Sequence, residues 1–128
     1  MWTFFHSRAL SFRYAFAGWW FVIRTQRNAW IHAVVSLAVI AVSFWLQLSP
    51  RDWAMIVVAM AIVWTAEFLN TALEAVVDLA SPQQQYLAKV GKDVGAAAVL
   101  IAAGSAALIG FLILGPPLWA RLQALFSH

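Results

Sequence analysis

The sequence contains no cysteine and little charge, and each shortage excludes a class of protein. Without a thiol, the 128-residue chain forms no disulfide and has no thiolate nucleophile or thiolate metal ligand. Charged residues make up 10% of the chain, whereas soluble domains carry about 25%. Hydrophobic residues make up 64%, so a water-soluble or disordered chain is excluded. We expect one all-α integral-membrane domain over residues 1–128.

The few charges are mostly basic, which gives a formal net charge of +3. A basic chain can bind nucleic acid through its phosphates. The apolar composition argues against a free nucleic-acid binder, so we expect no nucleic-acid partner and a lipid bilayer as the surroundings.

Two apolar stretches in the first half of the chain predict transmembrane helices. Residues 29–48 form a 20-residue run without formal charge, long enough for a hydrocarbon core of about 30 Å. A turn is expected at residues 49–52, where Pro50 disfavours helical geometry before it. The second helix is expected over residues 53–80. At about 1.5 Å per residue it is longer than the core, so its end should leave the membrane.

A third apolar stretch of 27 residues without charge covers residues 94–120. We expect its helix to span residues 94–114 and to end at Gly115-Pro116-Pro117, because proline breaks or kinks a helix. Within it, small residues recur every fourth position and leave a smooth strip for another helix. Three helices shield polar groups poorly from lipid, so we expect a homo-oligomer.

The basic residues predict the orientation of the spans. Six lie before the first span or after the second, against two on the opposite side. By the positive-inside bias, the amino terminus and the second loop of this multi-pass membrane protein are expected in the cytoplasm. The six are Arg8, Arg13, Arg24, Arg27, Lys89 and Lys92, and the two are Arg51 and Arg121.

Residues 4–23 precede the first span and have aromatic residues at helical spacings. This pattern favours an amphipathic helix on the membrane surface. The alternative is a short fourth helix packed against the bundle.

Polar residues follow one face of the second predicted helix. At about 100° per residue, Glu74 and Asp78 each lie within about 20° of Glu67, and Asn70 and Thr71 lie within about 60°. Glu67 is expected in the inner leaflet and Asp78 in water. A carboxylate inside a membrane is a functional hypothesis by default. The alternative is hydrogen bonding between helices together with a solvated helix end.

Lys92 follows in the next loop, where it can meet this acidic face. A cation beside carboxylates that could hold Mg²⁺ suits phosphoryl transfer. The chain has no Walker A motif and no glycine-rich nucleotide motif. From these residues alone, a kinase and an acid-lined ion pathway both remain open.

The segment EFLNTALEAVVD at residues 67–78, followed by KDVGAAAV at residues 92–99, closely resembles the signature of the small bacterial integral-membrane diacylglycerol kinase family. Residues 24–28, RTQRN, together with His32 resemble its undecaprenol kinase branch. The resemblance covers roughly residues 10–114.

This resemblance implies a homotrimer of three-span subunits with a surface helix, which transfers the γ-phosphate of ATP to a lipid hydroxyl with Mg²⁺. The lipid is undecaprenol or diacylglycerol. The alternatives are an acid-lined transporter or channel and a catalytically silent membrane scaffold. The resemblance implies the following roles for residues of this chain. Glu67 is the base; Glu74, Lys92 and Asp93 bind the nucleotide; Asn70 and Asp78 order the site; and Glu74 and Gln26 are metal ligands.

Gln26 is a departure from the branch's pattern, which has a glutamate at that place as a metal ligand. The amide oxygen of Gln26 can still bind a cation but brings no charge. The departure implies weaker metal binding, a metal held with an extra water, or an impaired enzyme.

Overall fold

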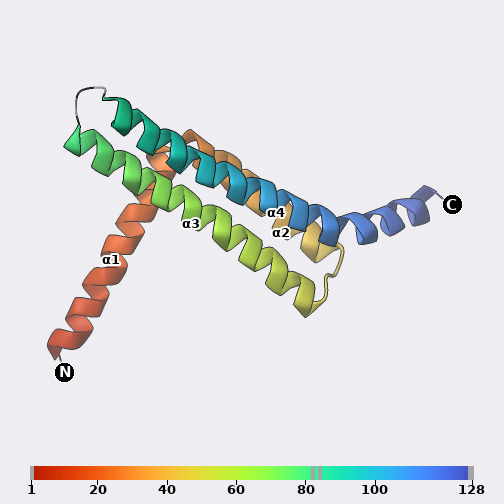
Figure 1. Cartoon of the computed structure of the whole chain (residues 1–128). Helices are drawn as coiled ribbons and strands as arrows, with labels where there is room; N and C mark the ends of the chain where they lie inside the picture. Colours follow the sequence, from red (N-terminus) through yellow and green to blue (C-terminus); the bar gives the residue numbers. More distant parts are fainter. Residues whose placement is uncertain (1, 82, 84, 127–128) are drawn as a thin grey trace.

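The computed structural model describes residues 2–81, 83 and 85–126, and in this range the side chains of residues 2–7 and 9 are outside the description. The described residues form helices throughout, joined by short turns (Figure 1). This confirms the all-α prediction. The helices are α1 (Trp2–Thr25), α2 (Arg27–Trp45), α3 (Pro50–Ala80) and α4 (Tyr86–Phe126).

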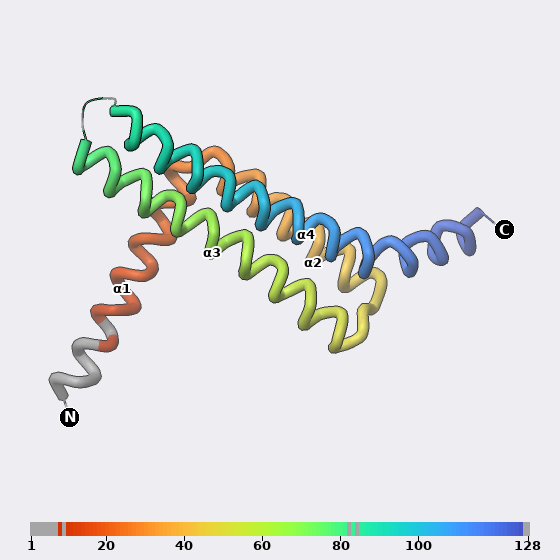
Figure 2. The backbone as a smooth tube through the Cα atoms, viewed as in Figure 1, coloured from red at the N-terminus to blue at the C-terminus, as the bar shows by residue number. Residues whose placement is uncertain are grey.

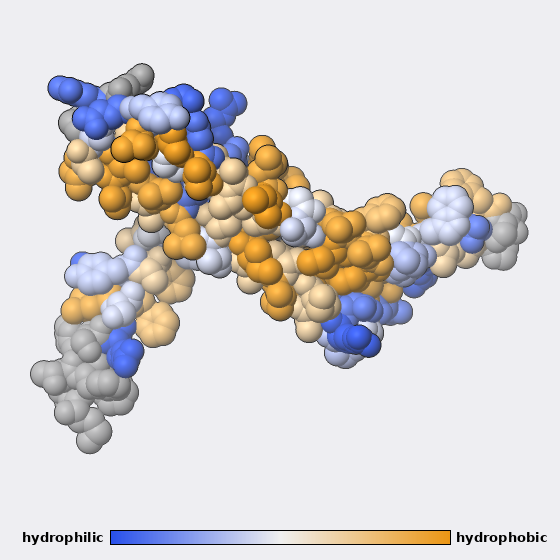
Figure 3. All heavy atoms as spheres, in the orientation of Figure 1, coloured by the Kyte–Doolittle hydropathy of each residue, from blue (hydrophilic) through white to orange (hydrophobic). Residues whose placement is uncertain are grey.

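Three of these helices, α2, α3 and α4, are long and apolar enough to cross a membrane. They run side by side, with α3 and α4 antiparallel, whereas α1 diverges from the bundle (Figure 2). The outward faces of the helices carry large exposed hydrophobic side chains. Hydrophilic residues gather toward the ends of the bundle and hydrophobic ones cover its middle (Figure 3). A lipid environment fits this surface.

The turn between α2 and α3 falls earlier in the chain than the sequence predicts, at residues 46–49. The prediction of a turn at residues 49–52 was wrong for residues 50–52, because α3 already begins at Pro50. Proline suits the first helical position, where no N–H is needed. Ser49 is the N-cap, and its Oγ accepts a hydrogen bond from the Asp52 N–H at 3.2 Å. The reversal falls earlier, at Gln47, whose φ is 54°.

The third apolar helix does not end at Gly115-Pro116-Pro117, and that prediction was wrong. Helix α4 continues through both prolines to Phe126. Each proline removes an N–H donor but holds φ at about −65°, a value that a helix accepts. The two prolines therefore kink the helix without ending it. The last turns of α4 accordingly change direction and point away from the bundle (Figure 1).

Candidate functional site

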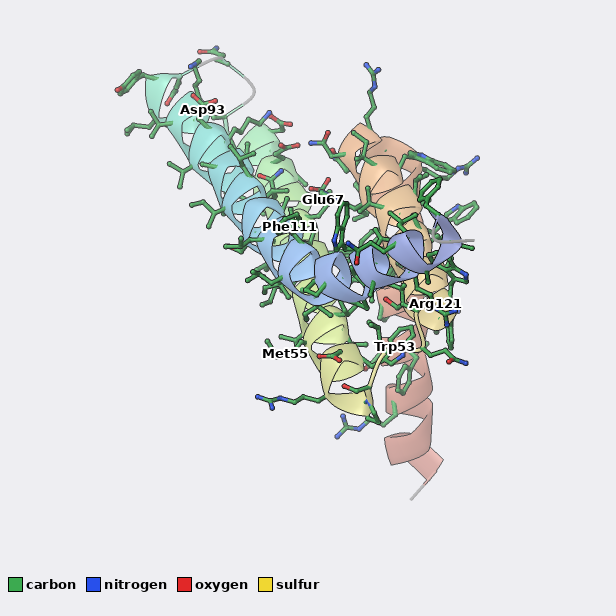
Figure 4. The ribbon with its side chains drawn as sticks, turned by 90° about the vertical axis from the view of Figure 1, so that its right-hand side faces the viewer. Trp53, Met55, Glu67, Asp93, Phe111 and Arg121 are labelled. Atoms are coloured by element: carbon green, nitrogen blue, oxygen red, sulfur yellow. The ribbon has the colours of Figure 1, made fainter. Side chains whose placement is uncertain are left out.

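Glu67 is the buried carboxylate at the centre of the site. It lies in the middle of α3 with 1% of its surface exposed, on the side that faces α2 (Figure 4). Its Oε2 atom is 3.7 Å from Nε2 of His32 on α2. This distance is too long for a hydrogen bond. Within the described part of the chain, neither atom has a hydrogen-bond partner.

One turn further along α3, Asn70 lies on the same helix face as Glu67 and contacts the next acidic residue, Glu74. Asn70 Nδ2 donates a hydrogen bond to Glu74 Oε1 at 3.1 Å. Asn70 Oδ1 is buried and, among the described residues, has no partner. Thr71 has a different role, because its Oγ1 donates to the backbone carbonyl of Glu67 at 2.9 Å. The predicted face therefore carries Glu67, Asn70 and Glu74 as site groups, and Thr71 as a helix contact.

Gly95 of α4 allows the two helices to approach closely beside Asn70. A Cβ atom at Gly95 would overlap Asn70 Oδ1 and would lie 3.0 Å from Leu73 Cδ2. Any larger residue at position 95 must therefore displace the Asn70 amide. The small residue holds the beginning of α4 against the acidic face of α3.

The site continues to the ends of α3 and α4 next to the second loop. Lys92 Nζ lies 2.6 Å from Asp78 Oδ1, so Lys92 meets the acidic face as expected. Asp93 points elsewhere and pairs with Lys89, whose Nζ is 2.9 Å from Asp93 Oδ2. A pocket of about 620 Å³ lies among these four side chains and Tyr86. Its mixed charges and its volume suit a polar ligand.

Gln26 is the single residue between α1 and α2. Its backbone is extended, with φ −99° and ψ 115°, and its half-buried side chain forms no capping hydrogen bond. No hydrogen bond or ion pair among the described residues joins Gln26 to Glu74. The structure therefore does not join these two predicted metal ligands by a hydrogen bond or an ion pair.

The oxygen atoms of α3 are suitable ligands for Mg²⁺. The described residues contain no cluster of three or more His, Asp or Glu side chains that could hold a metal by themselves. Mg²⁺ is usually bound through one or two carboxylates, with phosphate oxygens and water completing the site. The Glu74 carboxylate and the unpaired Asn70 Oδ1 are hard ligands of this kind. The residues present therefore fit a metal that arrives with phosphate.

The contact of His32 with Glu67 was not predicted from the sequence, where His32 was noted only as part of the resemblance to the undecaprenol kinase branch. His32 also lines an apolar groove of about 660 Å³ between α2, α3 and α4. One signal for its role was available. His32 is the only titratable residue in the first apolar run, residues 29–48, and a buried carboxylate was expected on the neighbouring span.

Comparison with known proteins identifies the family. The family model for prokaryotic diacylglycerol kinase matches residues 13–114. A diacylglycerol kinase of Synechocystis is 44% identical over 110 residues, which is 85% of this chain but 63% of that protein. The undecaprenol kinase of Bacillus subtilis is 39% identical over 108 residues, 84% of this chain and 88% of that protein.

A diacylglycerol kinase of Escherichia coli is 34% identical over 83 residues, 59% of this chain and 68% of that protein. The chain thus spans less than two thirds of the Synechocystis protein and most of the Bacillus protein. The match to the family model covers the second half of α1, all of α2 and α3, and α4 as far as Leu114, so it includes the candidate site residues. The chain therefore belongs to the prokaryotic diacylglycerol kinase family.

Proposed function

We propose that this chain is a lipid kinase, which transfers the γ-phosphate of ATP to the hydroxyl of undecaprenol or diacylglycerol. The observation that carries this proposal is the buried Glu67 carboxylate, which has an unpaired oxygen on an apolar helix. Glu67 and Glu74 lie on the same face of α3. This face continues to the end of the helix, where Asp78 pairs with Lys92. Relatives named diacylglycerol kinase and undecaprenol kinase support the same activity.

Glu67 acts as the general base in this proposal. Its Oε2 accepts the proton of the lipid hydroxyl while the hydroxyl oxygen forms a bond to the γ-phosphorus. The bond between the γ-phosphorus and the bridging oxygen breaks, and ADP leaves with that oxygen. The protein contributes mainly by positioning the two substrates and by neutralising phosphate charge. The lipid tail stays in the bilayer, and ATP arrives at the polar end of the helices.

The nucleotide is proposed to lie at the polar pocket between the ends of α3 and α4. Lys92 is proposed to hold the phosphates, Asp93 to take part in nucleotide binding by ordering the site, and Asp78 to fix Lys92 through their ion pair. Glu74, oriented by Asn70, and Gln26 are the proposed ligands of Mg²⁺. When bound, Mg²⁺ neutralises charge on the phosphates.

We further propose a homotrimer in a bacterial inner membrane, with the amino terminus in the cytoplasm. The bundle is thin, and α2, α3 and α4 expose large hydrophobic side chains on their outer faces. Helix α1 is proposed to lie on the membrane surface. In support, Phe12 and Phe16 of α1 are exposed, while Trp19 packs on Trp64 and Phe68 with ring centroids 5.0 and 5.1 Å apart.

The test is a transfer assay on the full chain in vesicles. Purified protein is incubated with Mg²⁺, ATP labelled at the γ-phosphate, and either undecaprenol or diacylglycerol. The lipid extract is then separated by chromatography. Label in the lipid fraction supports the kinase. Absence of labelled lipid with both acceptors, from protein that is folded and correctly inserted, would contradict it and favour a transporter or a scaffold.

A further inference from the structure

The groove between α2, α3 and α4 has a composition that suits a hydrocarbon chain. Its volume of about 660 Å³ falls within the range of roughly 300–1,000 Å³ for small-molecule sites. Its lining is apolar apart from His32, Ser36 and the indole nitrogen of Trp119. Ser36 is already engaged, because its Oγ accepts a hydrogen bond from Trp64 Nε1 at 3.2 Å. His32 is the only titratable residue in the lining.

His32 lines the groove and faces the buried carboxylate of Glu67, which is not itself part of the lining. The facing atoms, His32 Nε2 and Glu67 Oε2, are 3.7 Å apart, and both are buried without a partner among the described residues. Buried polar atoms are normally hydrogen-bonded, so an unpaired pair of this kind calls for an explanation. One oxygen atom about 2.8 Å from each would pair both, since that geometry closes a triangle with the observed separation. Because both atoms are fully buried, neighbouring side chains must shift to admit it.

We propose that His32 and Glu67 together hold the hydroxyl of the acceptor lipid, and that the groove takes a hydrocarbon chain attached directly to that hydroxyl group. The favoured substrate class is then a long-chain primary alcohol such as a polyprenol, and not an acylglycerol. This inference rests on the lipid kinase function proposed above. It adds His32 as a substrate-binding residue and selects between the two acceptors.

The two residues have complementary roles at the hydroxyl. His32 Nε2–H donates a hydrogen bond to the hydroxyl oxygen, while the hydroxyl hydrogen is donated to Glu67 Oε2. A lone pair of the oxygen stays free to form the bond to the γ-phosphorus as the bond to the bridging oxygen of ADP breaks. The proton finishes on Glu67. His32 changes no bond and fixes the position of the attacking oxygen.

The apolar lining favours one of the two candidate acceptor lipids over the other. Diacylglycerol carries two ester groups next to its hydroxyl, and burying their carbonyl oxygens without donors is unfavourable. Apart from His32, the only side-chain donors that the lining offers are the Ser36 hydroxyl, which already accepts from Trp64, and the indole N–H of Trp119. A polyprenol has no polar group besides its hydroxyl. A purely apolar helix from a second copy of the chain would fill the groove but would leave His32 and Glu67 unpaired.

The first experiment changes the donor at His32 in the full chain in vesicles. His32→Leu removes it, and His32→Gln places an amide N–H near the position of Nε2. We expect His32→Leu to raise the KM for undecaprenol about tenfold with the KM for ATP unchanged, and His32→Gln to recover most of the loss. Unchanged undecaprenol KM in His32→Leu, or a change confined to ATP, would overturn the proposal. If the leucine variant does not fold, failure of a folded His32→Gln variant to exceed one tenth of normal efficiency also overturns it.

The second experiment fills the groove. Gly110 lines it, whereas Gly104 of the same helix does not, and a Cβ atom at either position meets nothing within 4 Å. Gly110→Leu should raise the KM for undecaprenol several-fold and the KM for a short alcohol such as geraniol less, with Gly104→Leu unchanged. Equal effects of the two variants would contradict a chain in this groove. So would a changed oligomeric state in Gly110→Leu with a normal KM, since it would identify the groove as an interface between copies.

The wild-type assay distinguishes failure of the inference from failure of the function. Higher kcat/KM for undecaprenol than for diacylglycerol is the expected result. A preference for diacylglycerol overturns the inference and leaves the lipid kinase standing. Transfer to neither lipid overturns both.

Discussion

Asn70 of α3 packs directly against Gly95 of α4 at the site. The Asn70 amide occupies the space that a side chain at position 95 would take, and it donates to Glu74 at 3.1 Å. The packing of two helices and the orientation of a proposed metal ligand therefore depend on the same amide group.

Gly95→Ala should disturb the fold and the site together. The added methyl group must displace Asn70 and press on Leu73, and overpacking of this kind costs about 1–3 kcal/mol. We expect a lower thermal midpoint and lower turnover. In an Asn70→Ala background the same substitution should lower the midpoint much less. A full additional loss in that background would show that Asn70 is not the obstructing group.

Glu74→Gln should remove the negative charge of Glu74 and keep its hydrogen bond with Asn70. The glutamine oxygen can still accept from Asn70, so the packing of α3 against α4 should persist. The loss of charge should raise the Mg²⁺ concentration needed for half-maximal transfer, because Mg²⁺ prefers carboxylate ligands. Glu74→Ala should raise it at least as much. A Mg²⁺ titration that coincides with that of the wild type would remove Glu74 from the metal site.

Lys92→Ala should weaken the use of ATP. Lys92 pairs with Asp78 at 2.6 Å and is proposed to face the phosphates, so its loss should raise the KM for ATP about tenfold or more while the KM for lipid changes little. Lys92→Arg keeps the charge and should lose less. Initial rates with each substrate varied in turn provide the measurement. A larger effect on lipid than on ATP would mean that this role is misplaced.

Gln26→Glu restores the residue found in the branch's pattern. If Gln26 lies beside the metal in the assembled protein, the added carboxylate should increase transfer at limiting Mg²⁺. Because the new charge also repels Glu74, the gain should vanish or reverse when Mg²⁺ is withheld. Gln47→Glu makes the same change in the turn at the other end of α2 and serves as the control. Coincident curves for Gln26→Glu and the wild type would exclude Gln26 from the metal.

Much of the arrangement on α3 could be predicted because it is local. A helix of known period fixes which residues share a face, so Glu67, Asn70 and Glu74 were placed together from spacing alone. The pairing of Lys92 with Asp78 was also accessible, because a short connection brings the start of one helix beside the end of the previous one.

The contact between His32 and Glu67 could not be predicted in the same way. It depends on how α2 is rotated about its own axis relative to α3, and the apolar residues of α2 give little indication because its surroundings are apolar on most sides. The course of α4 beyond Gly115 was also not determined locally. Proline permits either a kink or an end, and the apolar sequence after Pro117 continues the helix.

The most direct test of the account is the loss of phosphate transfer in Glu67→Gln. This substitution keeps the size of the side chain and most of its hydrogen bonding but removes the proton acceptor. Transfer of labelled γ-phosphate to lipid is measured for the variant and the wild type, alongside their ATP binding and oligomeric state. The account predicts turnover lower by about 10² to 10⁴ with ATP binding and assembly unchanged. Turnover close to that of the wild type would contradict it.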